Sequence, residues 1–227
     1  MQKLTIDLDQ NKKIFFASDF HLGAPNKEQS RSREKKIIRW LDAVEKDAAA
    51  ILLVGDLFDF WIEYKKVVPK GFVRVLGKLA ELADAGIRIH YFVGNHDLWM
   101  QDYFEVELNI PVHHAPLEII WNDKTFLIGH GDGLGPGDNG YKRMKRVFTN
   151  PLAQALFRCL PTRWGIGLGQ YLSLKNKMIS GEETPHFLGN DKEWLVHYCQ
   201  EKEKEKKRHY YIFGHRHLPL NISIDDG

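Results

Sequence analysis

The sequence is poor in cysteine and contains no long apolar run. Its two cysteines, Cys159 and Cys199, lie far apart among 227 residues, so they cannot form a disulfide framework or a cysteine-rich metal site. We expect both to be buried, reduced thiols. No apolar stretch approaches the roughly 20 residues that a membrane-spanning helix requires. These absences exclude disulfide-stapled and membrane-spanning classes of protein.

The first residues show no pattern typical of a leader, and the charges nearly balance. Residues 1–7 contain no basic segment followed by an apolar core, so we expect no signal peptide and a cytoplasmic location. The 32 basic and 30 acidic residues leave a formal net charge of only +2. So small an excess does not indicate nucleic acid as a partner, and we expect none.

The hydrophobic pattern predicts strands that alternate with amphipathic helices, which is typical of an α/β protein with a largely parallel sheet. Helices are expected over residues 28–47, 71–85 and 191–208, and strands over residues 13–18, 50–54, 87–93, 117–121, 125–129 and 210–213. Residues 1–10 fit an edge strand. The highly charged stretch 201–208 is expected to be a solvated surface.

Five of these strands are followed directly by His, Asp or Asn, four of them after a Gly. The polar residues presented in this way are Asp19, His21, Asp56, Asp59, Asn95, His96, Asp97, His130, Asp132, His215 and His217. Sites in open α/β sheets form at the carboxyl ends of the strands. We therefore predict one metal centre at the edge of a sheet. His113 and His114 follow no such strand, so we expect a surface or packing role for them.

The side chains in this set suit a pair of divalent cations. Asp56 is the natural bridge, because a carboxylate can present an oxygen to both ions. Asp19, His21 and one of the two late histidines would complete one ion. Asn95, His130 and the other late histidine would complete the second. Mixed imidazole and oxygen ligands suit manganese, zinc, iron or cobalt better than calcium, and manganese is favoured.

The same residues form motifs that resemble those of the calcineurin-like metallophosphoesterases. The motifs are DFH at 19–21, GDLFD at 55–59, GNHD at 94–97, GHGD at 129–132 and GHRH at 214–217. The resemblance covers nearly the whole chain and implies an α/β/β/α sandwich of two mixed sheets. It also implies that the first ion is held by Asp19, His21, Asp56 and His217, and the second by Asp56, Asn95, His130 and His215.

Such a centre predicts hydrolysis at phosphorus. Two cations lower the pKa of a shared water and offset charge that develops on the phosphoryl oxygens. Asn95 is then both a ligand and a catalytic residue. His96 is expected to be a general acid or a charge-stabilising donor that binds no metal, or alternatively to pack behind the ligands. Asp59, Asp97 and Asp132 are expected to orient imidazole rings.

Residues 141–180 interrupt the alternation with aromatic, aliphatic and basic residues, which Pro151 and Pro161 divide into short helices. One interpretation is an ordinary helical subdomain with a solvated basic face. The other is a cap whose apolar side accepts lipid and whose cations hold phosphate or a membrane surface. We predict a metallophosphoesterase core of residues 1–140 and 181–227 and a helical cap insertion of residues 141–180.

Within the family, three stretches most resemble the enzymes that act on UDP-2,3-diacylglucosamine in lipid A biosynthesis. They are GDLFDFW at 55–61, the run at 130–141 that leads into the insertion, and GHRHLP at 214–219. The resemblance implies hydrolysis of a lipid-linked UDP-sugar to UMP and 2,3-diacylglucosamine 1-phosphate. It also implies a peripheral position on the inner face of the cytoplasmic membrane.

By the same resemblance, the substrate is contacted by His96, Asp138, Asn176 and Lys177. Many members of that group carry Arg where this chain has His96. Two other hypotheses stay open. A different calcineurin-like phosphodiesterase or phosphatase would act on nucleotides. A metal-free interaction scaffold would have lost ligands, whereas every expected ligand is present in this sequence.

Overall fold

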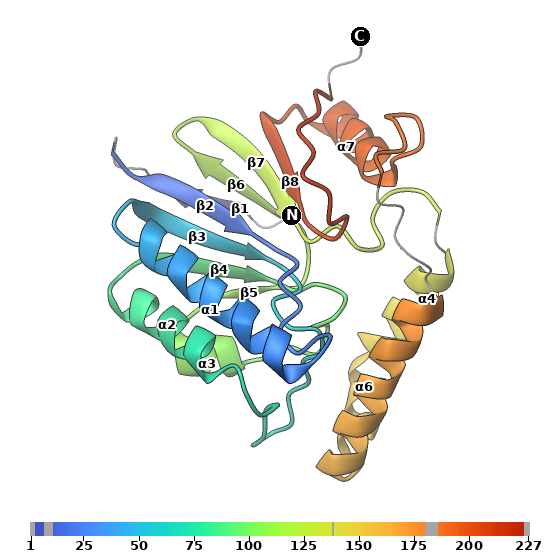
Figure 1. The fold of residues 1–227 in the computed structure, drawn as a ribbon. Coiled ribbons are helices and arrows are strands. Elements are labelled where there is room, and N and C mark those ends of the chain that lie inside the picture. The colour runs from blue at the N-terminus through green and yellow to red at the C-terminus, as the bar shows by residue number, and fades with distance from the viewer. Residues whose placement is uncertain (1–2, 7–10, 138, 180–185, 225–227) are drawn as a thin grey trace.

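A computed structural model describes residues 3–6, 11–137, 139–179 and 186–224. The chain forms two four-stranded sheets with helices packed around them (Figure 1). The strands are β1 (Lys3–Ile6), β2 (Lys13–Ala17), β3 (Ala48–Val54), β4 (Arg88–Phe92), β5 (Val112–His113), β6 (Leu117–Trp121), β7 (Lys124–Gly129) and β8 (Tyr210–Phe213). The helices are α1 (Lys27–Val44), α2 (Val73–Asp84), α3 (Tyr103–Leu108), α4 (Asn139–Phe148), α5 (Pro151–Arg158), α6 (Thr162–Ile179) and α7 (Trp194–Glu205).

One sheet is parallel and the other is mixed. In the order β2-β3-β4-β5 every neighbouring pair is parallel, because α1, α2 and α3 carry the chain back to the same end of the sheet. In the order β1-β6-β7-β8 the central pair is antiparallel and the outer pairs are parallel. The predicted two-sheet α/β fold is confirmed, although only one of the two sheets is mixed.

The core consists of two apolar layers that share β3. Ile51 and Leu53 face the layer filled by α1 and α2. Leu52 and Val54 point to the opposite side, where they meet residues of the mixed sheet such as Trp121. Both faces of β3 are buried, which explains why its sequence is apolar throughout rather than alternating.

The segment predicted as an insertion is helical and contains α4, α5 and α6. Asn150 caps α5 by accepting hydrogen bonds from the backbone of Leu152 and Ala153, and Pro151 occupies its first turn. In Figure 1 these helices lie to one side of the two sheets. No helix within the described ranges is both long and apolar enough to cross a membrane.

The expectation for the two cysteines is half right. Cys199 on α7 is buried, and burial raises the pKa of its thiol to about 12. Cys159 is exposed, because it lies at the carboxyl end of α5, which has no buried residues.

The expectation of a solvated surface at 201–208 is wrong for Arg208. Its Nε lies 3.0 Å from Oε2 of Glu118 on β6, and the two side chains are 4% and 2% exposed. Lys206 pairs with the other oxygen of Glu118. Burial alone would raise the pKa of Glu118, but the hydrogen bonds from Lys206 and Arg208 outweigh it and lower that pKa. The buried acid lies 90 residues away in sequence, so no local pattern reveals it.

Candidate metal centre

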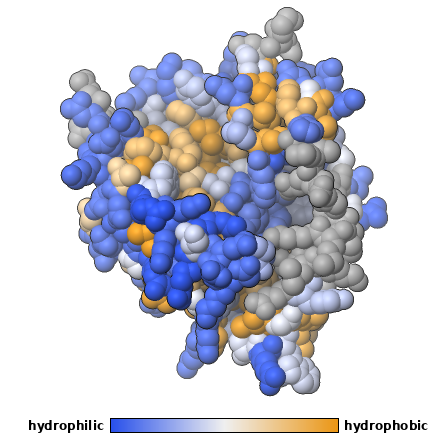
Figure 2. All heavy atoms as spheres, viewed as in Figure 1, coloured by the Kyte–Doolittle hydropathy of each residue, from blue (hydrophilic) through white to orange (hydrophobic). Residues whose placement is uncertain are grey.

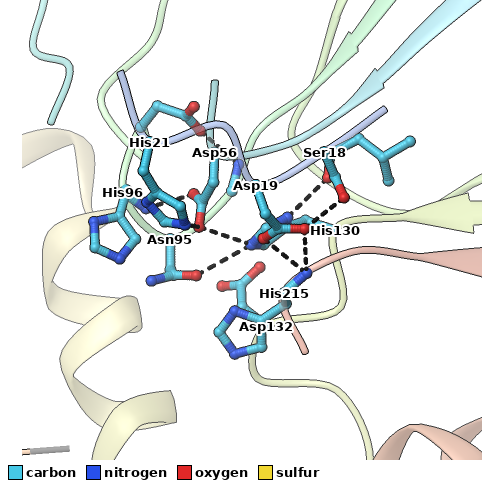
Figure 3. Close-up of polar contacts among 12 residues, drawn as sticks. Ser18, Asp19, His21, Asp56, Asn95, His96, His130, Asp132 and His215 are labelled. Atoms are coloured by element: carbon cyan, nitrogen blue, oxygen red, sulfur yellow. Dashed lines mark hydrogen bonds and ion pairs between the residues drawn. The ribbon is translucent and has the colours of Figure 1, made fainter. Parts of the chain in front are cut away.

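The strand ends of both sheets bring the predicted ligands together. The parallel sheet supplies Asp19, Asp56 and Asn95 from the ends of β2, β3 and β4, and the mixed sheet supplies His130 and His215 from β7 and β8 (Figure 3). The two halves are joined directly, because the backbone N–H of His215 donates to Asp19 Oδ1 at 3.0 Å. The site therefore lies where two sheets end, rather than at the edge of one.

Left-handed backbone directs several of these side chains. The φ angles of Asp19, His21, Asp56, His215 and His217 are 58°, 45°, 54°, 69° and 51°. Non-glycine residues rarely adopt this region, and each costs on the order of 1 kcal/mol. Strain that recurs at five positions of one cluster is typical of a functional site held by the surrounding fold.

Two glycines make room for the ligands. A Cβ on Gly94 would come within 3.0 Å of the Asp56 carboxylate, closer than real Cβ atoms approach, and a Cβ on Gly55 would meet the His130 ring in the same way. The Gly that ends each of these strands is thus required by the close approach of a ligand.

Asp56 lies at the centre of the cluster. Its Oδ1 accepts a hydrogen bond from the backbone N–H of His96 at 2.9 Å. Its Oδ2 is 3.2 Å from His130 Nε2 and 3.9 Å from His21 Nε2, and has no hydrogen-bond partner among the described residues. A buried carboxylate oxygen without a donor, placed between two imidazoles, fits a ligand shared by two cations.

His130 is held in an orientation suited to binding metal. Its Nδ1 donates to the carbonyl oxygen of Val54 at 2.8 Å, which directs Nε2 toward Asn95 Oδ1 at 3.1 Å and toward Asp56. Burial would lower the pKa of His130, but the charge of Asp56 outweighs it and raises that pKa to about 10. Burial opposes ionisation of Asp56, yet His130 holds the pKa of Asp56 well below its ordinary value. A bound cation would take the place of the proton that His130 carries beside Asp56.

A second cluster adjoins the first. His217 Nε2 lies 3.3 Å from Asp19 Oδ1 and 3.0 Å from His21 Nε2. Ser18 Oγ donates to Asp19 Oδ2 at 2.5 Å, a contact that the sequence did not suggest. Among the described residues, three groups of possible ligands have donor atoms within 4.8 Å of one another: Asp19, His21 and His217; Asp56, His130 and His215; and His21, Asp59 and His96. The first two groups correspond to the two predicted ions.

The third group explains how His96 is oriented. His96 Nδ1 lies 2.9 Å from the carbonyl oxygen of Asp59 and donates to it, and its ring meets that of His21 edge-on with centroids 4.7 Å apart. Asp59 Oδ1 faces His21 Nδ1 at 3.4 Å. Asp59 thus holds His96 through its backbone carbonyl rather than through its side chain, and its carboxylate lies near His21 without a hydrogen bond to Nδ1.

Asp97 and Asp132 have partners other than those predicted. Asp97 is fully buried, accepts from the backbone N–H of Gly94 at 2.6 Å and from the hydroxyl of Tyr91, and so fixes the turn that carries Asn95. Asp132 pairs with Lys145 Nζ at 2.6 Å and accepts from the Tyr141 hydroxyl.

These contacts tie α4 to the loop after His130. Sequence reasoning grouped Tyr141 and Lys145 with the insertion and missed this link, since nothing in their spacing points to Asp132.

The predicted substrate contacts are only partly visible. His96 lies at the cluster, whereas Asp138 and the side chains of Asn176 and Lys177 lie outside the described part of the structure. His113 Nε2 is 3.0 Å from His90 Nδ1, and His113 belongs to none of the three ligand groups found among the described residues. Next to His130, a small surface pocket is lined by residues that include His113, His114 and Lys145.

Comparison with known families agrees with this geometry. Residues 12–221 match the family described as calcineurin-like phosphoesterase. The chain therefore belongs to the calcineurin-like phosphoesterases, which are metal-dependent hydrolases.

Individual relatives carry a more specific name. The chain is 40% identical to the UDP-2,3-diacylglucosamine hydrolase of Porphyromonas gingivalis, over 94% of this chain and 86% of the relative. Relatives with the same name are 26% identical in Edwardsiella ictaluri, over 93% and 79% of the two chains, and 29% identical in Neisseria meningitidis, over 74% and 68%.

Proposed function

We propose that this protein hydrolyses the pyrophosphate bond of UDP-2,3-diacylglucosamine and releases UMP and 2,3-diacylglucosamine 1-phosphate, a step of lipid A biosynthesis. The observation that carries the proposal is the buried Oδ2 of Asp56, which has no hydrogen-bond partner among the described residues and lies 3.2 Å from His130 of one ligand group and 3.9 Å from His21 of another. The chain's similarity over most of its length to relatives of that name supports the substrate.

Seven side chains would hold two divalent cations in this proposal. The first would be bound by Asp19, His21, Asp56 and His217, and the second by Asp56, Asn95, His130 and His215. Their mixed nitrogen and oxygen donors favour manganese, with zinc, iron or cobalt as alternatives. When bound, such a pair lowers the pKa of water toward neutrality and offsets charge on phosphoryl oxygens.

Asn95 and His96 are the residues that we assign to the substrate. Asn95 Oδ1 faces His130, so its amide N–H groups point the other way and can donate to a phosphoryl oxygen (Figure 3).

In His96, Nδ1 donates to Asp59, which leaves Nε2 for the substrate. Burial lowers the pKa of His96 while the charge of Asp56 raises it, and the first effect is the larger. The negative phosphate of a bound substrate favours the protonated imidazole, which donates from Nε2 and stabilises the leaving phosphate.

The helical segment 141–180 serves as the cap in this proposal and takes the acyl chains. Asp138, Asn176 and Lys177 would contact the substrate from the cap and its preceding loop, by resemblance to the family.

Exposed apolar side chains support a peripheral position on the inner face of the cytoplasmic membrane. Leu152, Leu156 and Trp164 on α5 and α6 are 68%, 64% and 70% exposed, with Arg158 and Arg163 close in sequence. Figure 2 shows apolar atoms at the lower right, where α6 lies in Figure 1. Apolar side chains beside basic ones suit an anionic lipid surface that also delivers the substrate.

The test is the release of UMP by the purified protein with Mn²⁺, from UDP-2,3-diacylglucosamine and from the same sugar nucleotide without acyl chains. Bis-p-nitrophenyl phosphate serves as a small diester that reports on the metal centre alone. We expect faster release from the acylated substrate, and loss of all activity after chelation of the metal. Equal rates would indicate a phosphodiesterase acting on nucleotides. Inactivity on every substrate would indicate a scaffold.

A further inference from the structure

Two segments that continue from the metal-binding loops lie side by side and form a short rib, residues 60–64 and 96–99. The backbone N–H of Trp61 donates to His96 O at 3.3 Å, and that of Glu63 donates to Trp99 O at 3.3 Å. Ile62 and Trp99 form a parallel bridge. The rib is therefore a small piece of paired backbone.

The position of the rib links it to the ligands. Phe60 follows Asp56 by four residues, and Trp99 follows Asn95 by four. The rib therefore continues directly from the loops that carry these two ligands, and helices that pack on it are held at a fixed distance from the metal centre.

A buried carboxylate holds the rib in place. Glu63 is 3% exposed and accepts from Trp61 Nε1 at 2.9 Å. Its other oxygen accepts from the backbone N–H groups of Asp102 and Tyr103 at 3.0 and 3.1 Å. Both oxygens are thus hydrogen-bonded, as a buried carboxylate requires.

Helix α6 packs directly on the aromatic rings of the rib. A Cβ on Gly165 would come within 3.0 Å of the Tyr64 hydroxyl, and a Cβ on Gly169 within 3.0 Å of the Phe60 ring. Gly167, between them, is exposed, and a Cβ there would meet nothing within 4 Å. The rings therefore occupy the space that side chains at 165 and 169 would need.

The other two helices of the segment meet the rib at Trp99. The ring of Phe157 on α5 contacts Trp99 edge-on, with centroids 4.5 Å apart, and Phe148 on α4 lies at 6.0 Å. Neither Trp99 Nε1 nor the Tyr64 hydroxyl has a hydrogen-bond partner among the described residues, although both are buried. The contact is therefore held by the fit of apolar surfaces.

We propose that Phe60, Tyr64 and Trp99 are positioning residues that fix α4, α5 and α6 relative to the metal centre, and that this contact determines how well the enzyme uses its acylated substrate. The inference rests on the proposed function, because it needs a substrate that contacts both the metal centre and the helices. A small diester contacts only the metal centre, so its cleavage does not require the helices to be correctly placed relative to that centre.

The chain offers matched variants in a single helix. We substitute Ala for Gly165, Gly169 and, as the control, Gly167. Alanine has a higher helix propensity than glycine at all three positions. A loss of activity confined to G165A and G169A therefore cannot come from a change in helix propensity. We expect kcat/KM for UDP-2,3-diacylglucosamine to fall about tenfold or more in G165A and G169A, since small misplacements cost up to roughly 100-fold. Activity on bis-p-nitrophenyl phosphate should change little, and G167A should match the unaltered protein on both substrates.

A second variant separates the contact from other effects. In G165A the new Cβ meets the Tyr64 hydroxyl first, and the next nearest atoms, in the rings of Phe157 and Tyr64, lie at 3.1 and 3.2 Å. Tyr64→Phe removes that hydroxyl, which makes no hydrogen bond to the part of the chain that the structure describes, so Y64F alone should behave like the unaltered protein. The double variant Y64F/G165A should then recover most of the activity on the acylated substrate. Hydrogen exchange should be faster for α6 amides in G165A and G169A than in G167A.

Unchanged activity in G165A and G169A would overturn the inference. So would an equal loss on both substrates, or a loss in G165A that Y64F does not reverse. If the unaltered protein cleaves bis-p-nitrophenyl phosphate but releases no UMP, the proposed function fails instead. The exchange rates of the α6 amides then still decide whether the contact holds the helices.

Discussion

Gly94 and Asp56 illustrate how single residues decide the site. Gly94 begins the turn that Asp97 fixes, and its missing side chain leaves the space that the Asp56 carboxylate occupies. A ligand can therefore be displaced without being mutated.

We predict that Gly94→Ala reduces metal-dependent cleavage of bis-p-nitrophenyl phosphate by about 100-fold or more, as expected when a ligand is moved, and lowers the amount of bound Mn²⁺. Metal content by elemental analysis and initial rates measure the effect. Gly77→Ala is the control, because a Cβ on Gly77 in α2 meets nothing within 4 Å. A G94A protein with full metal content and rate would contradict the account.

At this scale the sequence predicted which residues gather but not what orients them. Each ligand follows a strand, and the site assembles because the strands end together. The backbone carbonyls of Val54 and Asp59 set the donor atoms of His130 and His96. Every residue has a carbonyl, so no pattern marks these two.

Among the elements, the end of α7 is joined to the mixed sheet through a buried acid, in addition to the hydrogen bond from the Tyr211 hydroxyl to Glu203. Glu118 on β6 receives Arg208 and Lys206, which follow the carboxyl end of α7. The lowered pKa of Glu118 means that its ionised form stabilises the folded state.

We predict that Glu118→Gln lowers the free energy of unfolding by about 2–3 kcal/mol at pH 7, because it leaves the buried Arg208 without its carboxylate. The stabilisation by Glu118 is fully present above its ordinary pKa of 4.5 and is lost as pH falls through the lower pKa of the folded state. The difference between the two proteins should therefore shrink below about pH 4. Urea unfolding across this pH range measures it.

Glu205→Gln is the matched control, since Glu205 is exposed and pairs only with Lys202 on the same helix surface. We expect it to change stability by less than about 0.5 kcal/mol at any pH. Equal effects of the two substitutions would show that the Glu118 pair does not hold α7.

Prediction from sequence succeeded for elements with a strong local signal. The strands with apolar runs and the helices divided by Pro151 and Pro161 appear where expected. The assignment of each strand to its sheet was not predictable from local pattern, because β1 pairs with β6 across more than 100 residues. A separation of 90 residues in sequence likewise hid the pairing of Glu118 with Arg208.

For the molecule as a whole, the exposed apolar side chains of α5 and α6 predict binding to a lipid surface. We expect Leu156→Ser with Trp164→Ser to weaken sedimentation with anionic vesicles several-fold, since each removes an exposed apolar group. Cleavage of bis-p-nitrophenyl phosphate should not change. Val106→Ser is the control, because Val106 is 70% exposed on α3, outside the helical segment. Equal loss in the control would mean that these helices are not the surface that meets the membrane.

The central claim is that two sheets together hold two cations around Asp56. Anomalous diffraction at the manganese edge, from crystals grown with Mn²⁺, tests it directly. We predict two peaks that share Asp56, one beside Asp19, His21 and His217 and the other beside Asn95, His130 and His215. A single peak among His21, Asp59 and His96, or no peak near Asp56, would contradict it.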